Sequence, residues 1–414
     1  MAKRLARLAP FVLLTVLSIL VTGCQGTGTG PVRPEPARVT ISPGEGAIDD
    51  RPDLGVGVSV SGGKLTGVTV ADRRGKQVAG YFNPGGTIWH STWALAPAQA
   101  YSVTAVVVNH NGTKSTEHAT FRTSAPTRTF TASVVEQPGE TVGVGMPIMV
   151  TFSRAIRDKG DVERSLQLRS SKPVVGAWFW MDNKNVWFRP KKHWPAYDKV
   201  RLDAHLTGVR GADGLYGTAN LSRTFKIGES LVVLASASSH RMKVWVNHRL
   251  RYNWPISTGQ PGRDTPNGRY LTIEKGNPVE MNSCSFGICP GNPGYYNVLV
   301  YDSVRFTWSG NYIHSAPWSV GEQGYANVSH GCVNLAPQYA VWYYNHANRG
   351  DPITIVGSPV AGTWNDGWTI WFLSWQKLLK GSALRQEVVV GRKGSYLTNP
   401  AAPTAPPQGV FGPR

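Results

Sequence analysis

Between residues 37 and 228 the chain is dominated by short runs in which apolar and polar residues alternate. Clear examples are Gly55–Val60, Tyr101–Val108 and Ser222–Ile227. A period of two places the apolar side chains on one face of a strand, whereas a helix needs a period near 3.6. Charged residues make up only 16% of the chain and glycine occurs 46 times, which also favours short strands joined by turns. We therefore predict a mainly β protein.

The alternating runs form two successive groups, in residues 37–125 and 126–228. The groups end alike, in Thr120-Phe-Arg-Thr123 and Thr224-Phe-Lys-Ile227. Several short strands in about 90 residues are typical of a small β-sandwich. We predict two tandem immunoglobulin-like β-sandwich domains with these boundaries, followed by further domains, because a chain of 414 residues has room for about two to four.

The stretch from His314 to Asn334 contains residues suited to covalent chemistry. Cys332 has two candidate bases, His314 and His330, and it directly follows Gly331. A thiol becomes a strong nucleophile near neutral pH only when a neighbour stabilises the thiolate, and histidine can accept its proton. A bare glycine backbone lets a substrate carbonyl approach a main-chain N–H. The alternative from composition is a buried structural cysteine beside two surface histidines.

The motif His314-(14 residues)-Ser329-His-Gly-Cys-Val-Asn334, with 15 residues between the two histidines, resembles the active-site signature of the L,D-transpeptidases, the YkuD-type cysteine enzymes of bacterial cell-wall synthesis. His314-Ser-Ala-Pro-Trp-Ser-Val320 is similar to the mycobacterial-type members in particular. The resemblance implies a β-rich catalytic domain at residues 229–357, with immunoglobulin-like modules before it. In that domain we expect one helix, from Pro337 to Asn348, with Ala340, Val341, Tyr344 and Ala347 on one face.

The same resemblance implies a set of site residues and a reaction. The expected catalytic residues are Cys332 (nucleophile), His314 (general base and acid), the Ser315 backbone carbonyl (orienting His314), Gly331 (oxyanion region) and Tyr296 (oxyanion hydroxyl, with Tyr295 one place away). The expected substrate-binding residues are Met281, Trp318, Ser329, His330 and Asn334. The reaction would join peptidoglycan stem peptides by 3-3 links through a cysteine thioester, releasing D-alanine. Carbapenems would acylate the thiol, and we expect no cofactor and no metal.

The predicted lid, from Met281 to Tyr296, departs from the family pattern. It contains Cys284 and Cys289, whereas the L,D-transpeptidase pattern has no cysteine pair in this loop. Disulfides persist outside the cytoplasm, and a four-residue spacer with a glycine can bring two cysteines into range. A loop disulfide is our first interpretation; a zinc site with a nearby histidine and two free thiols are the alternatives.

The N-terminus predicts export. A charged start is followed by the apolar run Phe11–Val21, which is short for a membrane span and typical of a signal peptide, residues 1–23. Val21-Thr-Gly-Cys24 resembles a lipobox, so Cys24 would be acylated and residues 24–36 would form a flexible tether. This implies anchoring to the outer face of the cell membrane. An ordinary cleaved signal with a chance cysteine is the alternative.

The C-terminal part predicts a packing extension and a tail. Trp364, Trp368, Trp371 and Trp375 recur at three- and four-residue spacings, as on one helical face. We expect residues 358–390 to pack as a short helical extension against the catalytic domain. Residues 391–414 are rich in Pro, Gly and Ala and are predicted to be disordered.

The net charge and the order of the histidine and the cysteine in the sequence reduce the number of functions to consider. The net charge of +18 fits attraction to anionic wall polymers or lipid headgroups, and equally a merely basic exported protein. Nucleic acid is not an expected partner, and no nucleotide-binding glycine loop is present. A papain-like peptidase would place its cysteine before its histidine. An L,D-carboxypeptidase or endopeptidase using the same thiol, and a non-catalytic wall-binding lipoprotein, stay as alternatives.

Overall fold

The computed structural model describes residues 36–397. The predicted signal peptide, the lipidation site Cys24 and nearly all of the tether lie outside the described residues. Within residues 36–397 the structure has three α-helices, of six, ten and six residues, and strands form most of the remaining regular structure. The prediction of a mainly β protein is confirmed. In this part of the chain, the helices are too short or too polar to cross a membrane.

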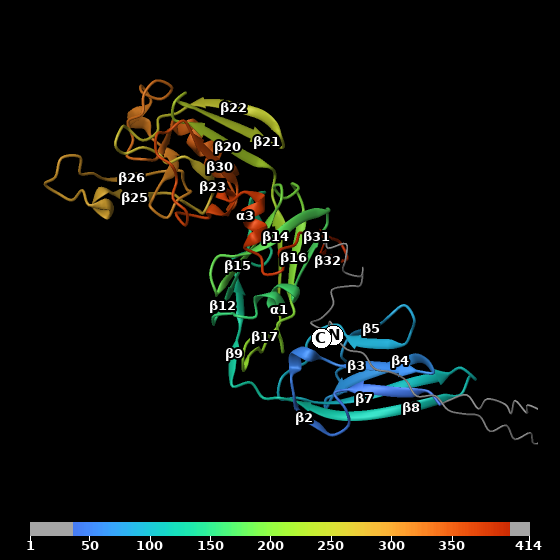
Figure 1. Ribbon diagram of the computed structural model, residues 1–414. Coiled ribbons are helices and arrows are strands. Elements are labelled where there is room, and N and C mark those ends of the chain that lie inside the picture. The colour runs from blue at the N-terminus through green and yellow to red at the C-terminus, as the bar shows by residue number, and fades with distance from the viewer. Residues whose placement is uncertain (1–35, 398–414) are drawn as a thin grey trace, which may run out of the picture. The chain divides into compact units, whose positions relative to one another are not determined.

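The first module is a β-sandwich of two four-stranded sheets (Figure 1). One sheet has the order β1 (Arg38–Ser42), β3 (Gly57–Ser61), β6 (Ile88–Ser91) and β5 (Gly80–Phe82), and the other β2 (Ala47–Asp50), β8 (Lys114–Thr123), β7 (Ala100–Asn109) and β4 (Gly63–Asp72). A 3-10 helix, η1 (Pro52–Leu54), follows β2. Alternate residues of β7, from Tyr101 to Val107, are buried between the sheets. The alternation seen in the sequence thus marks the inner face.

The second module is built around a six-stranded and a four-stranded sheet. The larger has the order β10 (Ala132–Val134), β12 (Ile148–Phe152), β15 (Asn185–Pro190), β14 (Val174–Trp180), β31 (Val388–Gly391) and β32 (Gly394–Leu397). The smaller has β11 (Thr141–Val142), β19 (Leu221–Ile227), β16 (Lys199–Ala204) and β13 (Leu166–Ser170). A three-stranded sheet of β17 (Arg210–Ala212), β18 (Leu215–Gly217) and β9 (Arg128–Phe130), and helix α1 (Lys159–Arg164), complete it. Two successive immunoglobulin-like modules therefore precede residues 229–357, as expected.

Residues 229–357, the expected catalytic domain, combine a five-stranded and a four-stranded sheet. The first has the order β22 (Arg249–Pro255), β21 (Arg241–Val246), β20 (Leu231–Ser236), β30 (Pro352–Val356) and β23 (Gly268–Leu271), and the second β24 (Glu274–Gly276), β27 (Ser303–Arg305), β28 (Tyr312–Ser315) and β29 (Val333–Leu335). A separate hairpin, β25 (Val279–Asn282) and β26 (Asn297–Val300), extends from the domain (Figure 1) and carries the predicted lid. Short 3-10 helices are η2 (Ser283–Phe286) and η3 (Pro317–Ser319).

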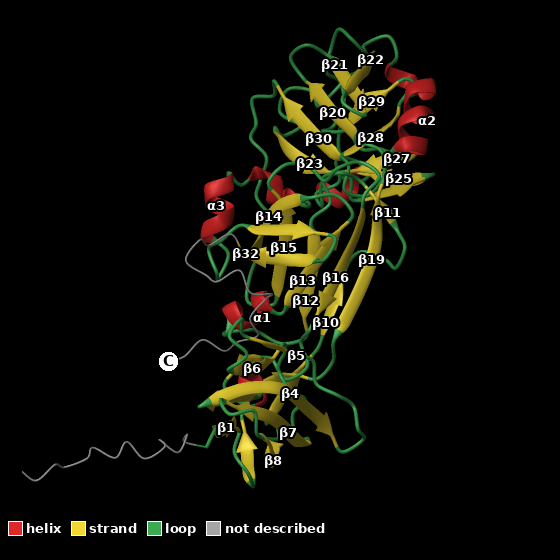
Figure 2. Cartoon of the chain, turned by 90° about the vertical axis from the view of Figure 1, so that its right-hand side faces the viewer, coloured by secondary structure: helices red, strands yellow, loops and turns green. Residues whose placement is uncertain are grey.

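Helix α2 (Pro337–His346) packs against β28 on the side of the domain (Figure 2). Its buried side chains are Ala340 and Tyr343, and Ala347 follows at the C-cap. The predicted helix is present, but its buried face is shifted: Val341 is 44% exposed. Ala340, Tyr343 and Ala347, at positions i, i+3 and i+7, face the core of the domain.

The predicted short helical extension is present, but its tryptophans do not lie on one continuous helix. In place of one helix it forms η4 (Thr369–Phe372) and α3 (Trp375–Lys380). It packs on the catalytic domain, as expected, and also on the second module. The Phe372 ring lies 5.1 Å from the Tyr270 ring, and the Trp371 indole N–H donates to the Gly145 carbonyl at 2.8 Å. The Arg189 guanidinium donates to the Leu373 carbonyl at 3.1 Å and stacks 4.5 Å from the Trp371 ring.

The start of the predicted disordered tail is also corrected. Residues 388–397 form the hairpin β31–β32, which adds to the edge of β14, with Val174 beside Val390. Three consecutive β-branched valines, Val388–Val390, favour a strand once an unpaired sheet edge is available. The rest of the predicted tail lies outside the described residues.

Candidate active site

Two parallel strands position the histidine and the cysteine of the motif. In β28 and β29, Ile313 lies beside Val333 and His314 beside Asn334. Extending this register by one residue brings Cys332 next to Tyr312, which shares a face of β28 with His314. The apolar Ile313 and Val333 are fully buried in the domain core and fix the two strands. The fold therefore brings together two residues that are far apart in sequence.

The hydrogen bond of His314 defines its tautomer. The side chain is buried, with 3% exposure, and its Nδ1 lies 2.9 Å from the backbone carbonyl oxygen of Ser315. A carbonyl can only accept, so Nδ1 carries the proton and Nε2 keeps a free lone pair. Burial lowers the pKa of His314 to about 4, which keeps the ring neutral at physiological pH. A neutral imidazole with a free Nε2 is the form that a general base requires.

Cys332 is protonated in the resting site. Burial raises the pKa of its thiol to about 11, although a hydrogen bond from the Tyr312 backbone N–H opposes the shift. The Sγ lies 3.8 Å from the Gly310 carbonyl oxygen, to which the thiol can donate. Both pKa shifts, of Cys332 and of His314, therefore favour a neutral pair over a thiolate and an imidazolium.

Gly331 fixes the backbone next to the thiol. Its φ of +116° lies where side-chain-bearing residues are strained, and an added Cβ would meet Asn311 Nδ2 at 2.6 Å. Its carbonyl accepts from Thr265 Oγ1 at 2.8 Å and from Asn311 Nδ2 at 2.9 Å, and its N–H donates to Ser329 Oγ at 3.1 Å. Because that N–H is already used, Gly331 supplies conformation and not an oxyanion donor. Ser329 in turn donates to the Cys332 carbonyl at 2.7 Å, so it holds the loop rather than a substrate.

A cavity of about 1040 Å³ is lined by Cys332. Its walls include Cys332, Gly331 and His330 from the motif, and Met281 and Tyr296 from the lid. The structure therefore brings these five sequence-predicted residues to one surface. The volume is sufficient for a peptide of several residues.

Tyr296 faces the thiol from the lid. Burial raises the pKa of its hydroxyl to about 12, and Cys332 adds to this shift while the charge of Arg263 opposes it. The ring lies 5.0 Å from the His330 ring, edge to face. A hydroxyl protonated at neutral pH can donate a hydrogen bond into the cavity. Tyr295, in contrast, is 37% exposed and does not line it.

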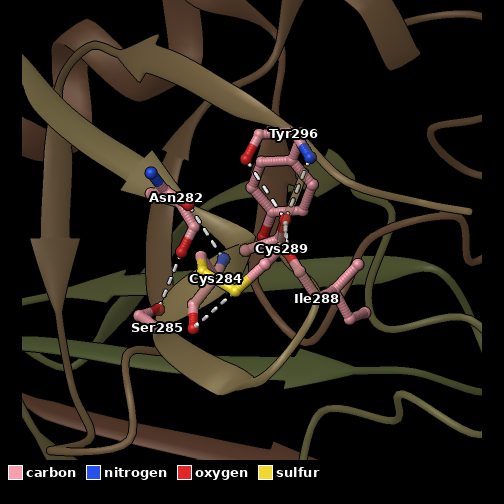
Figure 3. Close-up of a disulfide and its surroundings, with 7 residues drawn as sticks. Asn282, Cys284, Ser285, Ile288, Cys289 and Tyr296 are labelled. Atoms are coloured by element: carbon pink, nitrogen blue, oxygen red, sulfur yellow. Dashed lines mark hydrogen bonds between the residues drawn. A yellow bond between two sulfur atoms is a disulfide. The ribbon is translucent and has the colours of Figure 1, made fainter. Parts of the chain in front are cut away.

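A disulfide joins Cys284 to Cys289 in the lid (Figure 3). The buried Ser283 links this loop to Tyr296: its hydroxyl donates to the Ile288 carbonyl at 2.7 Å, and the Tyr296 N–H donates to that hydroxyl at 2.9 Å. The Ser283 N–H also donates to the Tyr296 carbonyl at 3.0 Å. The disulfide loop is therefore coupled to the backbone of Tyr296 through one serine.

Two expected substrate-binding residues lie elsewhere. Asn334 is 3% exposed and donates to Ser319 Oγ at 3.0 Å inside the domain, because it follows the buried register of β29. Trp318 is 59% exposed and lies 6.0 Å from the His314 ring, outside the cavity walls. Neither side chain lines the cavity, and the buried His314 does not line it either.

The sequence interpretation missed three residues that shape the site. Thr265 and Asn311 hold the Gly331 carbonyl, and Arg263 lines the cavity. Thr265 directly precedes Pro266-Asn-Gly268, a sequence with reverse-turn signals, and could have been noticed there. Asn311 and Arg263 carry no signal in the sequence. For residues 36–397, no group of three or more His, Cys, Asp or Glu side chains is arranged to hold a metal.

Comparison with known proteins agrees with this geometry. Residues 230–355 match the model of the L,D-transpeptidase catalytic domain, and residues 48–210 match that of the bacterial Ig domain. L,D-transpeptidase 2 of Mycobacterium tuberculosis is 33% identical over 348 residues, which cover 84% of this chain and 85% of the relative. L,D-transpeptidase 5 of the same organism is 33% identical over 379 residues, covering 88% and 82%. A solved structure of the L,D-transpeptidase LdtMt1 in complex with imipenem shares 37% identity, covers 56% of this chain and all of that one, and has a TM-score of 0.47. The chain belongs to the L,D-transpeptidase family.

Proposed function

We propose that this protein cross-links peptidoglycan stem peptides through a thioester on Cys332. The observation that carries the proposal is the tautomer of His314, whose Nδ1–H is held by the Ser315 carbonyl so that Nε2 is free to take a proton. Membership of the L,D-transpeptidase family supports this proposal. The proposed substrates are a stem tetrapeptide donor and a second stem peptide as acceptor.

In the acylation step, the thiol of Cys332 gives its proton to His314 Nε2 as the sulfur attacks the donor carbonyl at position 3. Burial disfavours both ions of a separated thiolate and imidazolium pair. Proton transfer therefore accompanies the attack. The C–N bond to the terminal D-alanine then breaks, and His314 returns the proton to the leaving amine. Such acid and base catalysis contributes about 10²- to 10⁴-fold.

The Cys332 N–H and the Tyr296 hydroxyl stabilise the tetrahedral oxyanion. The raised pKa of Tyr296 keeps its proton in place for donation at neutral pH. Removing one such donor typically costs about 10²- to 10³-fold in rate. His330 borders the cavity beside Tyr296 and contacts the bound peptide.

In the second step, the side-chain amine of the acceptor attacks the thioester and forms the 3-3 link. The C–S bond breaks, and His314 carries the amine proton to the departing sulfur. Water competes for the same thioester, so the acceptor must be held close to the thioester carbonyl. Carbapenems carry a strained acyl group of the same kind, and we propose that they acylate Cys332.

Product analysis tests this function. Purified protein incubated with stem tetrapeptide should release D-alanine and form a cross-linked dimer. Tripeptide without dimer would identify a carboxypeptidase, and no turnover at all would reject both enzymes.

We further propose that the protein is exported and anchored by a lipid on Cys24 to the outer face of the cell membrane. The motif Val21-Thr-Gly-Cys24 and the preceding apolar run support this proposal. Metabolic labelling with a fatty acid should mark the wild type and not Cys24→Ala. An unlabelled wild type would reject the anchor.

A further inference from the structure

Two arginines line the active-site cavity, and their environments differ. Arg305 forms an ion pair with Glu274 at 2.7 Å and donates to the carbonyls of Thr307 at 2.8 Å and Trp308 at 2.6 Å. Its charge and its N–H groups are used within the fold. Among the ion pairs of the described residues, none involves Arg263.

Arg263 lies between the catalytic loop and the lid. Its carbonyl oxygen lies 3.7 Å from the position that a Cβ on Gly331 would occupy. Its Nη2 lies 3.6 Å from the corresponding position on Gly294, in the lid just before Tyr296. Burial lowers the pKa of His330, and the positive charge of Arg263 lowers it further. Burial raises the pKa of Tyr296, and the same positive charge opposes that rise. The guanidinium is therefore beside the groups that surround the reacting carbonyl.

One nitrogen of this guanidinium lacks an acceptor. Arg263 Nη1 is buried and has no hydrogen-bond partner among the residues that the structure describes. The carboxylates that line the same cavity bind other groups: Asp264 accepts from the Gly262 N–H at 3.1 Å, and Glu280 accepts from Asn297 Nδ2 at 3.0 Å. A buried cationic N–H without an acceptor is costly, and a ligand that supplies an oxygen removes that cost.

We propose that Arg263 is a specificity-determining residue that binds a carboxylate of the donor stem peptide. This inference rests on the proposed function. Guanidinium and carboxylate are matched in geometry, and the pair can form two parallel hydrogen bonds. The donor has a carboxylate on its terminal D-alanine, one residue beyond the reacting carbonyl, and others on its side chains. Arg263 would orient the donor before the attack by Cys332.

Binding to an inactive protein tests the inference directly. In the Cys332→Ala background, calorimetry with stem tetrapeptide should show about 10- to 100-fold weaker binding for Arg263→Gln, the range expected for a charged hydrogen bond. Arg263→Lys should retain part of the affinity. The matched control is Arg241→Gln, which removes the same charge from an exposed position of β21 outside the cavity, and it should bind like its parent.

Amidated donors identify the carboxylate. A donor amidated at its C-terminus, and another amidated on its side chains, are each titrated into the Cys332→Ala parent and into its Arg263→Gln variant. The amidation that abolishes the difference in affinity between these two proteins marks the group that Arg263 binds.

Several outcomes would overturn the proposal. The first is equal affinity of Arg263→Gln and its parent for the donor, and the second is an equal loss of affinity in Arg241→Gln. The third is a difference in affinity between Arg263→Gln and its parent that persists with both amidated donors. The fourth is no measurable donor binding by the Cys332→Ala protein. Dimer formation by the wild type reports separately on the proposed function. A wild type that forms dimers while Arg263→Gln binds normally would reject only the role of Arg263.

Discussion

Replacing Gly331 by alanine should disable the site without unfolding the domain. The φ of +116° costs a side-chain-bearing residue about 1–3 kcal/mol. The new methyl group would meet Asn311 Nδ2 at 2.6 Å, so Asn311 must move and lose its 2.9 Å bond to the Gly331 carbonyl, at about 1 kcal/mol. The total of about 2–4 kcal/mol is below the typical stability of a domain, about 5–15 kcal/mol.

The strain acts on the residue next to the nucleophile, where a displacement of about 1 Å can cost about 10²-fold in rate. We therefore predict a loss of about 100-fold or more in dimer formation, with a cooperative melting transition preserved. Gly321→Ala is the matched control, because Gly321 has no atom within 4 Å of an added Cβ and its φ is outside the left-handed region. A Gly331→Ala protein as active as Gly321→Ala would refute this reasoning.

Three further predictions concern other groups. His314→Ala should reduce turnover more than His330→Ala, because the Ser315 carbonyl holds the His314 ring in the tautomer with a free Nε2; the reverse ranking would exchange their roles. Changing Cys284 and Cys289 together to serine should alter the rate of carbapenem acylation more than the melting temperature. The reason is that closing so short a loop contributes at most about 2–3 kcal/mol to the free energy of unfolding. Alkylation of both thiols in unreduced protein would disprove the disulfide. Burial raises the pKa of Glu136 from 4.5 to about 8, so the folded state holds a proton that the unfolded state loses, and stability falls as pH rises through this interval. Glu136→Gln should remove most of that fall in melting temperature, and an unchanged pH profile would contradict the assignment.

Local patterns predicted the β modules well, because the alternation of buried and exposed residues is a property of each strand by itself. The C-terminal extension shows where this fails. Tryptophan spacing indicated one helical face on the catalytic domain, yet the tryptophans do not lie on one continuous helix, and Trp371 also packs on the second module, where its indole N–H donates to the Gly145 carbonyl. The choice of partner depends on which buried acceptors the folded chain leaves open, and spacing does not encode it.

Some residues of the active site could be predicted from the sequence, and others could be identified only from the fold. Cys332 and His314 stand in a motif, so the sequence identifies them, and the strand register explains how they meet. Arg263 and Asn311 come from other loops, and only the fold brings them to the cavity and to Gly331. Asn334 belongs to the motif but is buried by the register of β29, so motif membership alone misplaces its side chain.

The covalent intermediate gives the most direct test of the central claim. Protein is incubated with a stem tetrapeptide donor whose side-chain amine is acetylated, so that it cannot serve as an acceptor. The reaction is quenched in acid and measured by intact mass spectrometry, and the adduct is then mapped by digestion. The account predicts a mass increase equal to the donor minus D-alanine, located on Cys332 and removed by hydroxylamine, as a thioester requires. An adduct on another residue, or dimer formation by Cys332→Ala, would contradict it.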